Sequence, residues 1–266
     1  MGALCRGVNT AGEDVLWTGL GYRCLGDGSG FMDPHLQKKE SVRKSLRAAA
    51  EVMRRSQGRP PHLNCFGLHE WAMLYRPDGT SSEPRRHQSL PLRLSQAELN
   101  AVVEGQPIAC THFDAFRFFV PEAVPLNTVD DLTRSRQAEL EQPGCVHATM
   151  DLFRYSIKLW PWVPSELLAD ALELAISARV LDMRASPYDL SAYDEAARTP
   201  RRSRDSPGSL APIHSTASFD FSPIRIESEA GRREYQRIQS SLATRAAPVR
   251  RRLLLEYDHA IAAWDA

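Results

Sequence analysis

Hydrophobic residues recur at every third or fourth position in several stretches of the chain, a spacing that places them on one face of an α-helix. This pattern predicts helices over residues 41–57, 146–160, 165–184, 228–244 and 248–264. The last two are predicted as separate helices, because a proline at position 248 suits the first turn of a new helix.

Two helices carry signals at their beginnings. Ser95 starts a short helix that runs to about Glu104, and Glu98 is placed to complete a capping box with it. Ser165 is the expected N-cap of the 165–184 helix. We expect the residues that follow at near-helical spacing to share a face of that helix, namely Leu168, Leu172, Ala175, Arg179 and Asp182.

Strand-like patterns occupy residues 90–94, 108–120 and 223–228. In the longest of these, alternation places His112, Asp114, Phe116 and Phe118 on one face of the strand and Arg117 on the other. Together these elements predict one domain over residues 1–266 with an α+β fold. A small mixed or antiparallel sheet is expected, covered by helices, with a mainly helical C-terminal half.

Residues 196–218 lose this periodicity and are dominated by Pro, Ser and Arg, which predicts a disordered insertion. The chain as a whole has 33 basic and 33 acidic residues, so its net charge favours neither nucleic acid nor a membrane surface. Five cysteines without a CxxC pair suit a reducing compartment. There is no apolar stretch of transmembrane length and no clear signal peptide, so we expect a cytoplasmic protein that does not enter membranes.

Candidate chemistry begins with His69 and Glu70, which interrupt the apolar run CFGLHEWAMLY. A zinc-protease HExxH helix is excluded, because Met73 stands where the second histidine is required. The pair either belongs to a polar site or makes structural hydrogen bonds in the core, since a buried carboxylate is costly without a partner.

Two further pairs combine a histidine with an aspartate. His112 and Asp114 are two residues apart on the predicted strand, and His147 and Asp151 are four apart on a predicted helix. An HxD pair with a distant histidine, either His147 or His69, matches a two-histidine, one-carboxylate metal site. The alternatives are a carboxylate that orients an imidazole, a local ion pair or a structural hydrogen bond.

The segment LDMRASPYDL ends the 165–184 helix with several charged groups. An acid at this end opposes the helix dipole, so Asp182 requires a cationic partner, and Arg117 and Arg184 are the candidates. Asp189 and Tyr188 follow in the adjoining loop. A buried network of aspartate and arginine is the structural alternative.

Eight stretches follow one another in an order that resembles one bacterial family, common in actinobacteria and labelled 3-methyladenine DNA glycosylase. They read CFGLHEWAMLYR, PLRL, THFDAFRFF, PLNT, QPGCVHATMDLFRY, VPSELLADALELA, LDMRASPYDL and PIRIESEAGRREY. The resemblance covers about residues 60–255 apart from the insertion. An aromatic and basic segment that family members carry ahead of the region equivalent to residue 15 is expected to be missing here, and Ala148 stands where the family tends to have Asn.

The resemblance implies a DNA-repair hydrolase that cleaves the N-glycosidic bond of alkylated bases, although a helix-hairpin-helix motif is not evident. DNA or another nucleobase-containing molecule would be the substrate, with a carboxylate stabilising the cationic sugar and aromatic rings stacking on the base. The candidate catalytic residues are His69, Glu70, His112, Asp114, Arg117, His147 and Asp151. The candidate substrate-binding residues are Trp71, Tyr75, Phe116, Asn127, Arg184 and Asp189.

Two other hypotheses come from the residues themselves. One is a metal-dependent enzyme acting on a small molecule, with His112, Asp114 and His147 as candidate ligands of a divalent metal. The other is a non-catalytic binding or structural protein. The sequence does not determine the oligomeric state.

Overall fold

The computed structural model describes residues 39–77, 90–193 and 220–265, together with the backbone of four short strands nearer the N-terminus. The predicted insertion at 196–218 lies outside the described residues. No helix within them combines the length and the apolar character needed to span a membrane.

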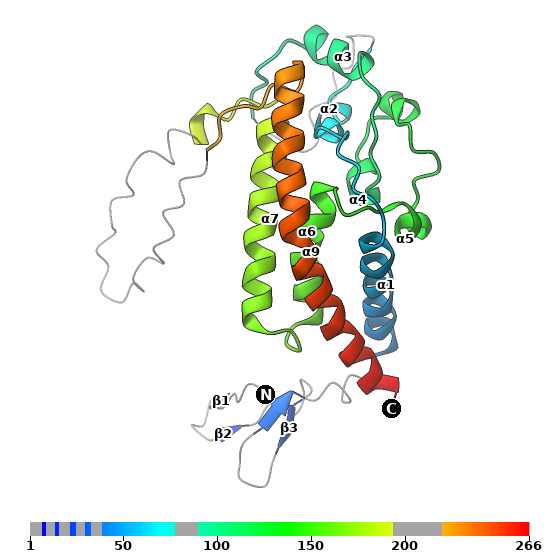
Figure 1. Ribbon diagram of the computed structural model, residues 1–266, viewed down its shortest axis with the longest axis vertical. Coiled ribbons are helices and arrows are strands. Elements are labelled where there is room, and N and C mark those ends of the chain that lie inside the picture. Colours follow the sequence, from blue (N-terminus) through cyan, green and yellow to red (C-terminus); the bar gives the residue numbers. More distant parts are fainter. Residues whose placement is uncertain are drawn as a thin grey trace, which may run out of the picture.

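Three helices in the second half of the chain pack side by side along their lengths. These are α6 (Val146–Leu159), α7 (Ser165–Ala185) and α9 (Glu229–Asp265), and α7 runs in the opposite direction to α6 and α9 (Figure 1). The buried stripe of α7 contains three alanines at positions 171, 178 and 185. Such small side chains let α6 and α9 approach α7 closely, which brings polar residues on these helices within reach of one another.

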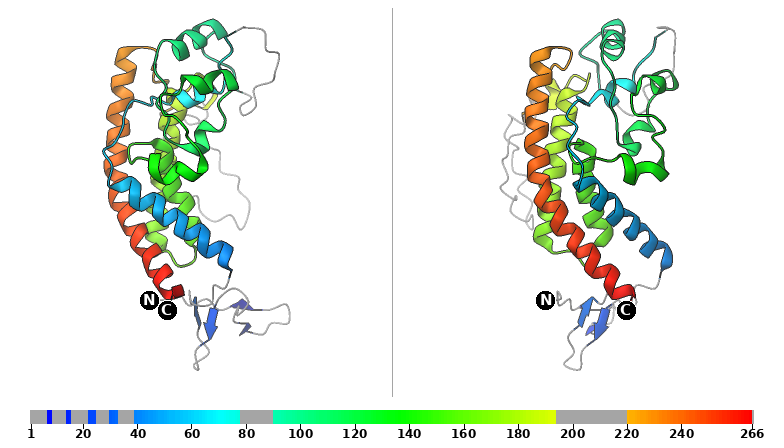
Figure 2. Two further views of the ribbon diagram at one scale, coloured as in Figure 1. Left: turned by 90° about the vertical axis from the view of Figure 1, so that its right-hand side faces the viewer. Right: turned by 45° about the vertical axis from the view of Figure 1, so that its right-hand side comes forward.

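A fourth helix, α1 (Glu40–Gln57), crosses α9 and contacts α5 (Gln137–Leu140) (Figure 2). Its buried residues include Leu46, Ala49 and Met53, so the predicted apolar face is confirmed. The remaining short helices lie beside the upper half of α7 and α9 in Figure 1. They are α2 (Leu68–Ala72), α3 (Gln96–Glu104), α4 (Phe113–Phe116), and the 3-10 helices η3 (Pro121–Leu126) and η4 (Arg134–Arg136).

The predicted α+β fold is wrong, because the protein is mainly helical. The strands that the structure describes are very short and form two separate antiparallel pairs near the N-terminus. They are β1 (Gly7–Val8) with β2 (Asp14–Val15), and β3 (Tyr22–Cys24) with β4 (Gly30–Met32). None of the segments predicted as strands forms a ladder within the described residues, where only the isolated bridges Leu92 to Tyr188 and Ile108 to Asn127 occur.

The segment 108–120 shows why the strand prediction was wrong. It is rich in Phe and other residues with high β propensity, but the side chains that it buries most deeply toward its end are Ala115 and Phe119, four positions apart. This is helical spacing, and the backbone N–H of Phe116 donates to the carbonyl of His112 at 3.0 Å to begin α4. The need to bury side chains against neighbouring helices therefore overrides the intrinsic strand preference.

The C-terminal segment is one helix of 37 residues rather than two, with Pro248 in its interior. A proline removes one backbone hydrogen bond of the helix. Here its ring is exposed, while Ala246 and Val249 on either side are buried against the other helices. Water can therefore reach the carbonyl that loses its partner, and the packing on both sides keeps the helix continuous.

The buried face of α7 is displaced by one position from the predicted face. Leu167 and Leu174 are buried, whereas Leu172 is 41% exposed. The helix begins at Ser165, with Pro164 rather than Ser165 as its N-cap. Asp182 belongs to both the predicted and the observed face, and it is fully buried.

The predicted caps of two other helices are confirmed. Ser95 and Glu98 form the capping box of α3. At the start of α9 the hydroxyl of Ser228 accepts a hydrogen bond from the backbone N–H of Gly231 at 3.1 Å. A side chain is not possible at Gly231, because a Cβ atom there would lie 2.0 Å from the carbonyl oxygen of Arg225.

Candidate metal centre

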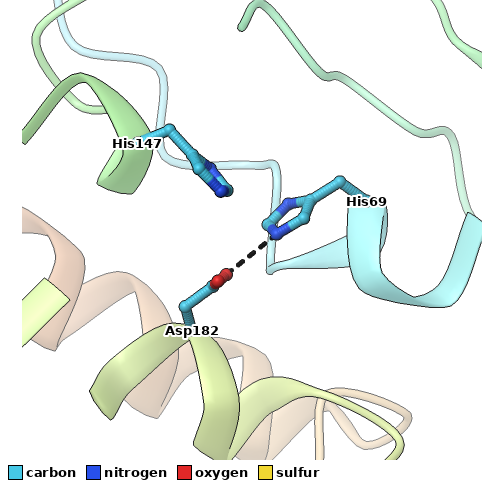
Figure 3. Close-up of side chains that lie close together, drawn as sticks. All are labelled: His69, His147 and Asp182. Atoms are coloured by element: carbon cyan, nitrogen blue, oxygen red, sulfur yellow. Dashed lines mark ion pairs between the residues drawn. The ribbon is translucent and has the colours of Figure 1, made fainter. Parts of the chain in front are cut away.

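Two histidines and an aspartate from three different helices meet in the interior of the protein. His69 comes from α2, His147 from the first turn of α6 and Asp182 from the last turns of α7 (Figure 3). His69 Nε2 lies 3.0 Å from Asp182 Oδ1, and the centroids of the two imidazole rings are 4.4 Å apart. His69 and Asp182 are buried and His147 is half-buried.

A left-handed turn places His69 beside Asp182. Phe66 and Gly67 both have positive φ angles, 48° and 70°, immediately before α2. At Gly67 a Cβ atom would lie 3.3 Å from the Cβ of Ala185 on α7. The lack of a side chain thus lets the start of α2 approach α7 so closely that His69 reaches the carboxylate.

Arg179 connects the acids around this cluster. Its Nη1 donates to Asp182 Oδ2 at 2.8 Å and to Glu70 Oε1 at 3.1 Å. His69 contacts Asp182, and its neighbour Glu70 contacts Arg179. Because Arg179 and Asp182 are three positions apart on α7, both residues of α2 meet the same part of that helix. Both residues of the HE pair therefore have polar partners, which both interpretations of this pair, a polar site and structural hydrogen bonds, predicted.

The two atoms that face each other form a buried ion pair. His69 Nε2 and Asp182 Oδ1 lie 3.0 Å apart in a geometry that does not meet the criteria of a hydrogen bond, and within the described residues neither atom has a hydrogen-bond partner. One ligand atom from each of His69, His147 and Asp182 lies within 4.8 Å of the others. Atoms that bind one metal ion at about 2.0–2.2 Å can lie this close together without a hydrogen bond between them.

The protonation states of His147 and Asp182 suit cation binding, whereas Asp182 favours the protonated form of His69, whose proton a metal ion would have to displace. Burial lowers the pKa of His147 well below its ordinary value, and the adjacent His69 lowers it further, so His147 is neutral at pH 7. Burial would raise the pKa of Asp182, but His69 and the other nearby positive charge hold it below the ordinary value. Burial disfavours the charged form of His69, but the attraction of Asp182 is stronger and raises its pKa.

A second histidine–carboxylate pair adjoins the cluster. His112 Nδ1 lies 2.5 Å from Glu141 Oε2, and both side chains are only 2% exposed. The His112 ring stacks on His147 with 5.2 Å between centroids, and its Nε2 faces Asp151 at 3.8 Å. One ligand atom from each of His112, Glu141 and Cys145 would also fit around an ion. This second set has one imidazole and a buried, protonated thiol, whereas the first set has two imidazoles.

Asp114, a predicted metal ligand with His112 and His147, does not join them. Its carboxylate binds Arg134 in a bidentate pair at 2.5 and 3.2 Å and accepts from Arg154 at 2.9 Å. Arg117 lies 3.4 Å from it and is half exposed. The prediction relied on strand alternation. Because His112 precedes a helical turn instead, Asp114 points to a different group of side chains.

Asp151 and His147 do not pair with each other, although they share α6. Asp151 binds Arg154 and lies near His112. His147 contacts the rings of His69 and His112. The helical spacing of these two residues therefore brings both to one region without a local ion pair.

The aromatic residues predicted to bind substrate are mostly part of the core. Trp71 is fully buried, and its indole N–H donates to the carbonyl of Ala185 at 3.0 Å. The hydroxyl of Tyr75 donates to Glu104 at 2.8 Å. Phe116 packs on Phe119 with 5.0 Å between ring centroids.

The polar residues predicted to bind substrate hold loops together. Buried Asn127 accepts from the N–H of Cys110 at 2.8 Å and donates to its carbonyl at 3.2 Å. Arg184 donates to the carbonyl of Ser222 at 2.8 Å, which ties the end of α7 to the segment before α9. Asp189 accepts from the backbone N–H of Ser191 at 2.9 Å in a local turn.

Three residues of this region were not among the predicted site residues. Nothing in the sequence pattern indicated Glu141 as a site residue, apart from its position beside a stretch that contains a histidine. Arg179 was predicted only as a member of a helix face. Asp182 had a clear signal, because an acid near a helix C-terminus requires a positive partner; its partners are His69 and Arg179 rather than Arg117 or Arg184.

Comparison of the chain with protein-family models, with curated proteins and with solved structures finds no match.

Proposed function

We propose that this protein is a metal-dependent enzyme acting on a small molecule, with one divalent metal ion held by His69, His147 and Asp182. The observation that carries the proposal is the convergence of three ligand atoms, one each from His69, His147 and Asp182, within 4.8 Å of one another in the interior, with the His147 imidazole neutral. Two imidazoles and one carboxylate are a ligand set used by zinc hydrolases and by non-haem iron enzymes.

The surroundings of the three ligands support this role. Arg179 occupies Asp182 Oδ2 and leaves Oδ1 for the ion. Partners of this kind fix the orientation of a ligand and are typical of metal sites. Three protein ligands leave at least one coordination position for water or substrate, and metal-bound water is deprotonated near neutral pH.

The His112–Glu141 pair supplies the proton acceptor of this proposal. Glu141 binds Nδ1 of His112 and so leaves Nε2 for proton transfer, and the ring lies against His147. A histidine oriented by a carboxylate is a frequent general base. An ion held by these residues would supply an activated water for attack on the substrate, and His112 would accept the proton of that water.

Metal analysis tests the proposal directly. The protein is purified without chelators and its bound transition metals are measured by mass spectrometry, before and after incubation with Zn²⁺, Fe²⁺ or Mn²⁺. We expect about one ion per chain in wild type and loss of the ion in His69→Ala. His259→Ala is the matched control, because His259 is exposed on α9 and pairs only with Glu256 among the described residues. A wild-type protein that takes up none of these ions would remove the proposal.

A second candidate is cleavage of the N-glycosidic bond of alkylated bases, as the family resemblance implies. The feature that favours it is the group of three arginines around Asp114, whose side chains are 40–57% exposed at positions 117, 134 and 154. Such groups are able to contact phosphates. Release of free 3-methyladenine from alkylated DNA by the purified protein tests this candidate. If metal-loaded protein releases no base and does not bind DNA, the candidate is removed.

The cysteines support a reducing, cytoplasmic location for either activity. Cys65, Cys110 and Cys145 are free thiols. Burial raises the pKa of Cys110 to about 12 and that of Cys145 well above its ordinary value, so both remain protonated.

A further inference from the structure

A pocket lies away from the candidate metal centre, between the C-terminal end of α1 and the middle of α9. These two helices contact each other where α1 crosses α9 (Figure 2). The pocket has a volume of about 330 Å³, which is within the range of small-molecule sites. Its polar lining residues are Gln57, Arg59, Ser240, Thr244, Arg250 and Arg251. We call this the basic pocket, because it has three arginines and none of the described residues that line it is acidic.

Arg250 is the unusual member of this lining. Its side chain is only 2% exposed, and its Nη2 makes no hydrogen bond within the described residues. Arginine is almost never fully buried unless it is paired, because an uncompensated buried charge is costly. Burial lowers the pKa of Arg250, and attraction to Glu141 opposes this change. Arg250 also lines a small internal cavity together with Glu141 and Asp151. An anion in the basic pocket would add electrostatic compensation from the pocket side.

Arg59 is held in place from the other side of the pocket. Its Nη1 donates to the carbonyl of Glu141 at 2.6 Å and its Nη2 to the carbonyl of Ala138 at 2.9 Å. These bonds to neutral backbone groups orient the guanidinium without cancelling its charge. A preorganised cation of this kind binds an anion with little loss of side-chain entropy.

We propose that the basic pocket binds a small molecule through a phosphate group. Arg59, which is held by backbone carbonyls, the buried Arg250 and the exposed Arg251 supply positive charge, and arginine forks match phosphate oxygens in bidentate geometry. The volume exceeds that of a phosphate ion alone, and the apolar surface of Pro61, Pro143, Ala243 and Ala247 is available to the rest of the molecule. This inference does not depend on the proposed metal centre, with which the basic pocket shares no residue.

Calorimetric titration with inorganic phosphate, AMP and adenosine tests the proposal at constant ionic strength. We expect saturable binding of AMP and weaker binding of phosphate, and no binding of adenosine. Ala247→Glu, which places a carboxylate in the pocket from a half-buried position of α9, should abolish binding. Arg251→Gln should weaken it about tenfold. Arg252→Gln is the matched control, because Arg252 pairs with Asp170 outside the pocket and its loss should leave binding unchanged.

Two further variants separate this site from the metal centre and from a folding defect. Binding should persist in Asp182→Asn. Phosphate that bound instead to a metal ion at the metal centre would be lost in this variant, so the two sites are distinguished. Arg250→Lys keeps the charge but not the fork, and should weaken binding while circular dichroism remains that of wild type. The proposal is overturned if wild type gives no saturable binding of phosphate or AMP at 10 mM or so. It is equally overturned if Ala247→Glu binds both ligands as wild type does.

Discussion

Two acidic side chains of this protein, Asp114 and Asp182, differ in the partners of their carboxylate oxygens. At the surface, Asp114 binds Arg134 and Arg154 with both oxygens. In the interior, Asp182 has one oxygen bound by Arg179, and the other forms an ion pair with His69 at 3.0 Å. The surface group pairs an acid with arginines alone, whereas in the interior group the acid also faces two imidazoles.

This comparison separates structural acids from ligand-binding acids more clearly than burial alone. Asp114 and Asp182 both adjoin histidines and arginines, and both have lowered pKa values in spite of the opposing effect of burial. They differ in their partners, because Asp114 pairs with arginines and Asp182 also lies beside His69 and His147. We therefore expect substitutions at the interior group to change metal binding, and substitutions at the surface group to change stability alone.

The largest effect is expected for Asp182→Asn. The amide keeps the shape of the side chain but removes the charged ligand, so bound metal should fall from about one ion per chain to almost none. Metal analysis and circular dichroism on the same sample check this. Full metal occupancy in a folded Asp182→Asn protein would exclude Asp182 as a ligand.

Arg179→Gln should have the next largest effect. Arg179 orients Asp182 and holds Glu70, and loss of such an outer partner typically weakens metal binding about 10–100-fold. Competition with a coloured chelator measures the change in affinity. Arg245→Gln is the control, since Arg245 pairs with Glu173 at the surface, and an equal loss in both variants would contradict the role given to Arg179.

Gly67→Ala tests the turn that positions His69. The added methyl group would occupy a positive φ of 70° and lie 3.3 Å from Ala185, which should destabilise the protein by about 1–2 kcal/mol. Metal affinity should fall as well, because α2 has to move away from α7. Gly58→Ala provides the comparison, since a Cβ atom there meets no atom closer than 4.0 Å. Equal stability of the two variants in urea unfolding would show that this turn is not strained.

The smallest effect is expected for Asp114→Asn, which should leave metal content unchanged. The pKa of Asp114 is lowered in the folded protein, so its charge stabilises the fold above the unfolded-state pKa of about 4 and this contribution is lost as the pH falls. We expect a loss of about 1 kcal/mol at pH 7, because the pair is partly exposed to water. The difference from wild type should shrink below pH 4 in urea unfolding. Loss of metal in this variant would reverse the comparison between the two groups.

Local patterns in the sequence were sufficient for most of the helices. The apolar spacing over 41–57, 146–160 and 165–184 and the caps at Ser95 and Ser228 correspond to helices and caps in the structure. The same kind of reasoning failed for 108–120. Its residues prefer strands, but strand formation requires a neighbouring strand, and helices surround this segment instead.

The sequence by itself determined which chemical groups are available: histidines at 69, 112 and 147, and acids placed within apolar runs where they are costly without a task. Only the tertiary structure decided which acid meets which histidine. His69 and Asp182 are brought together by the packing of α2 on α7, and His112 and Glu141 by the path of the chain between α4 and α6. Helical periodicity acts over a few residues, whereas these pairings depend on the close approach of helices across a shared core, which no local pattern encodes.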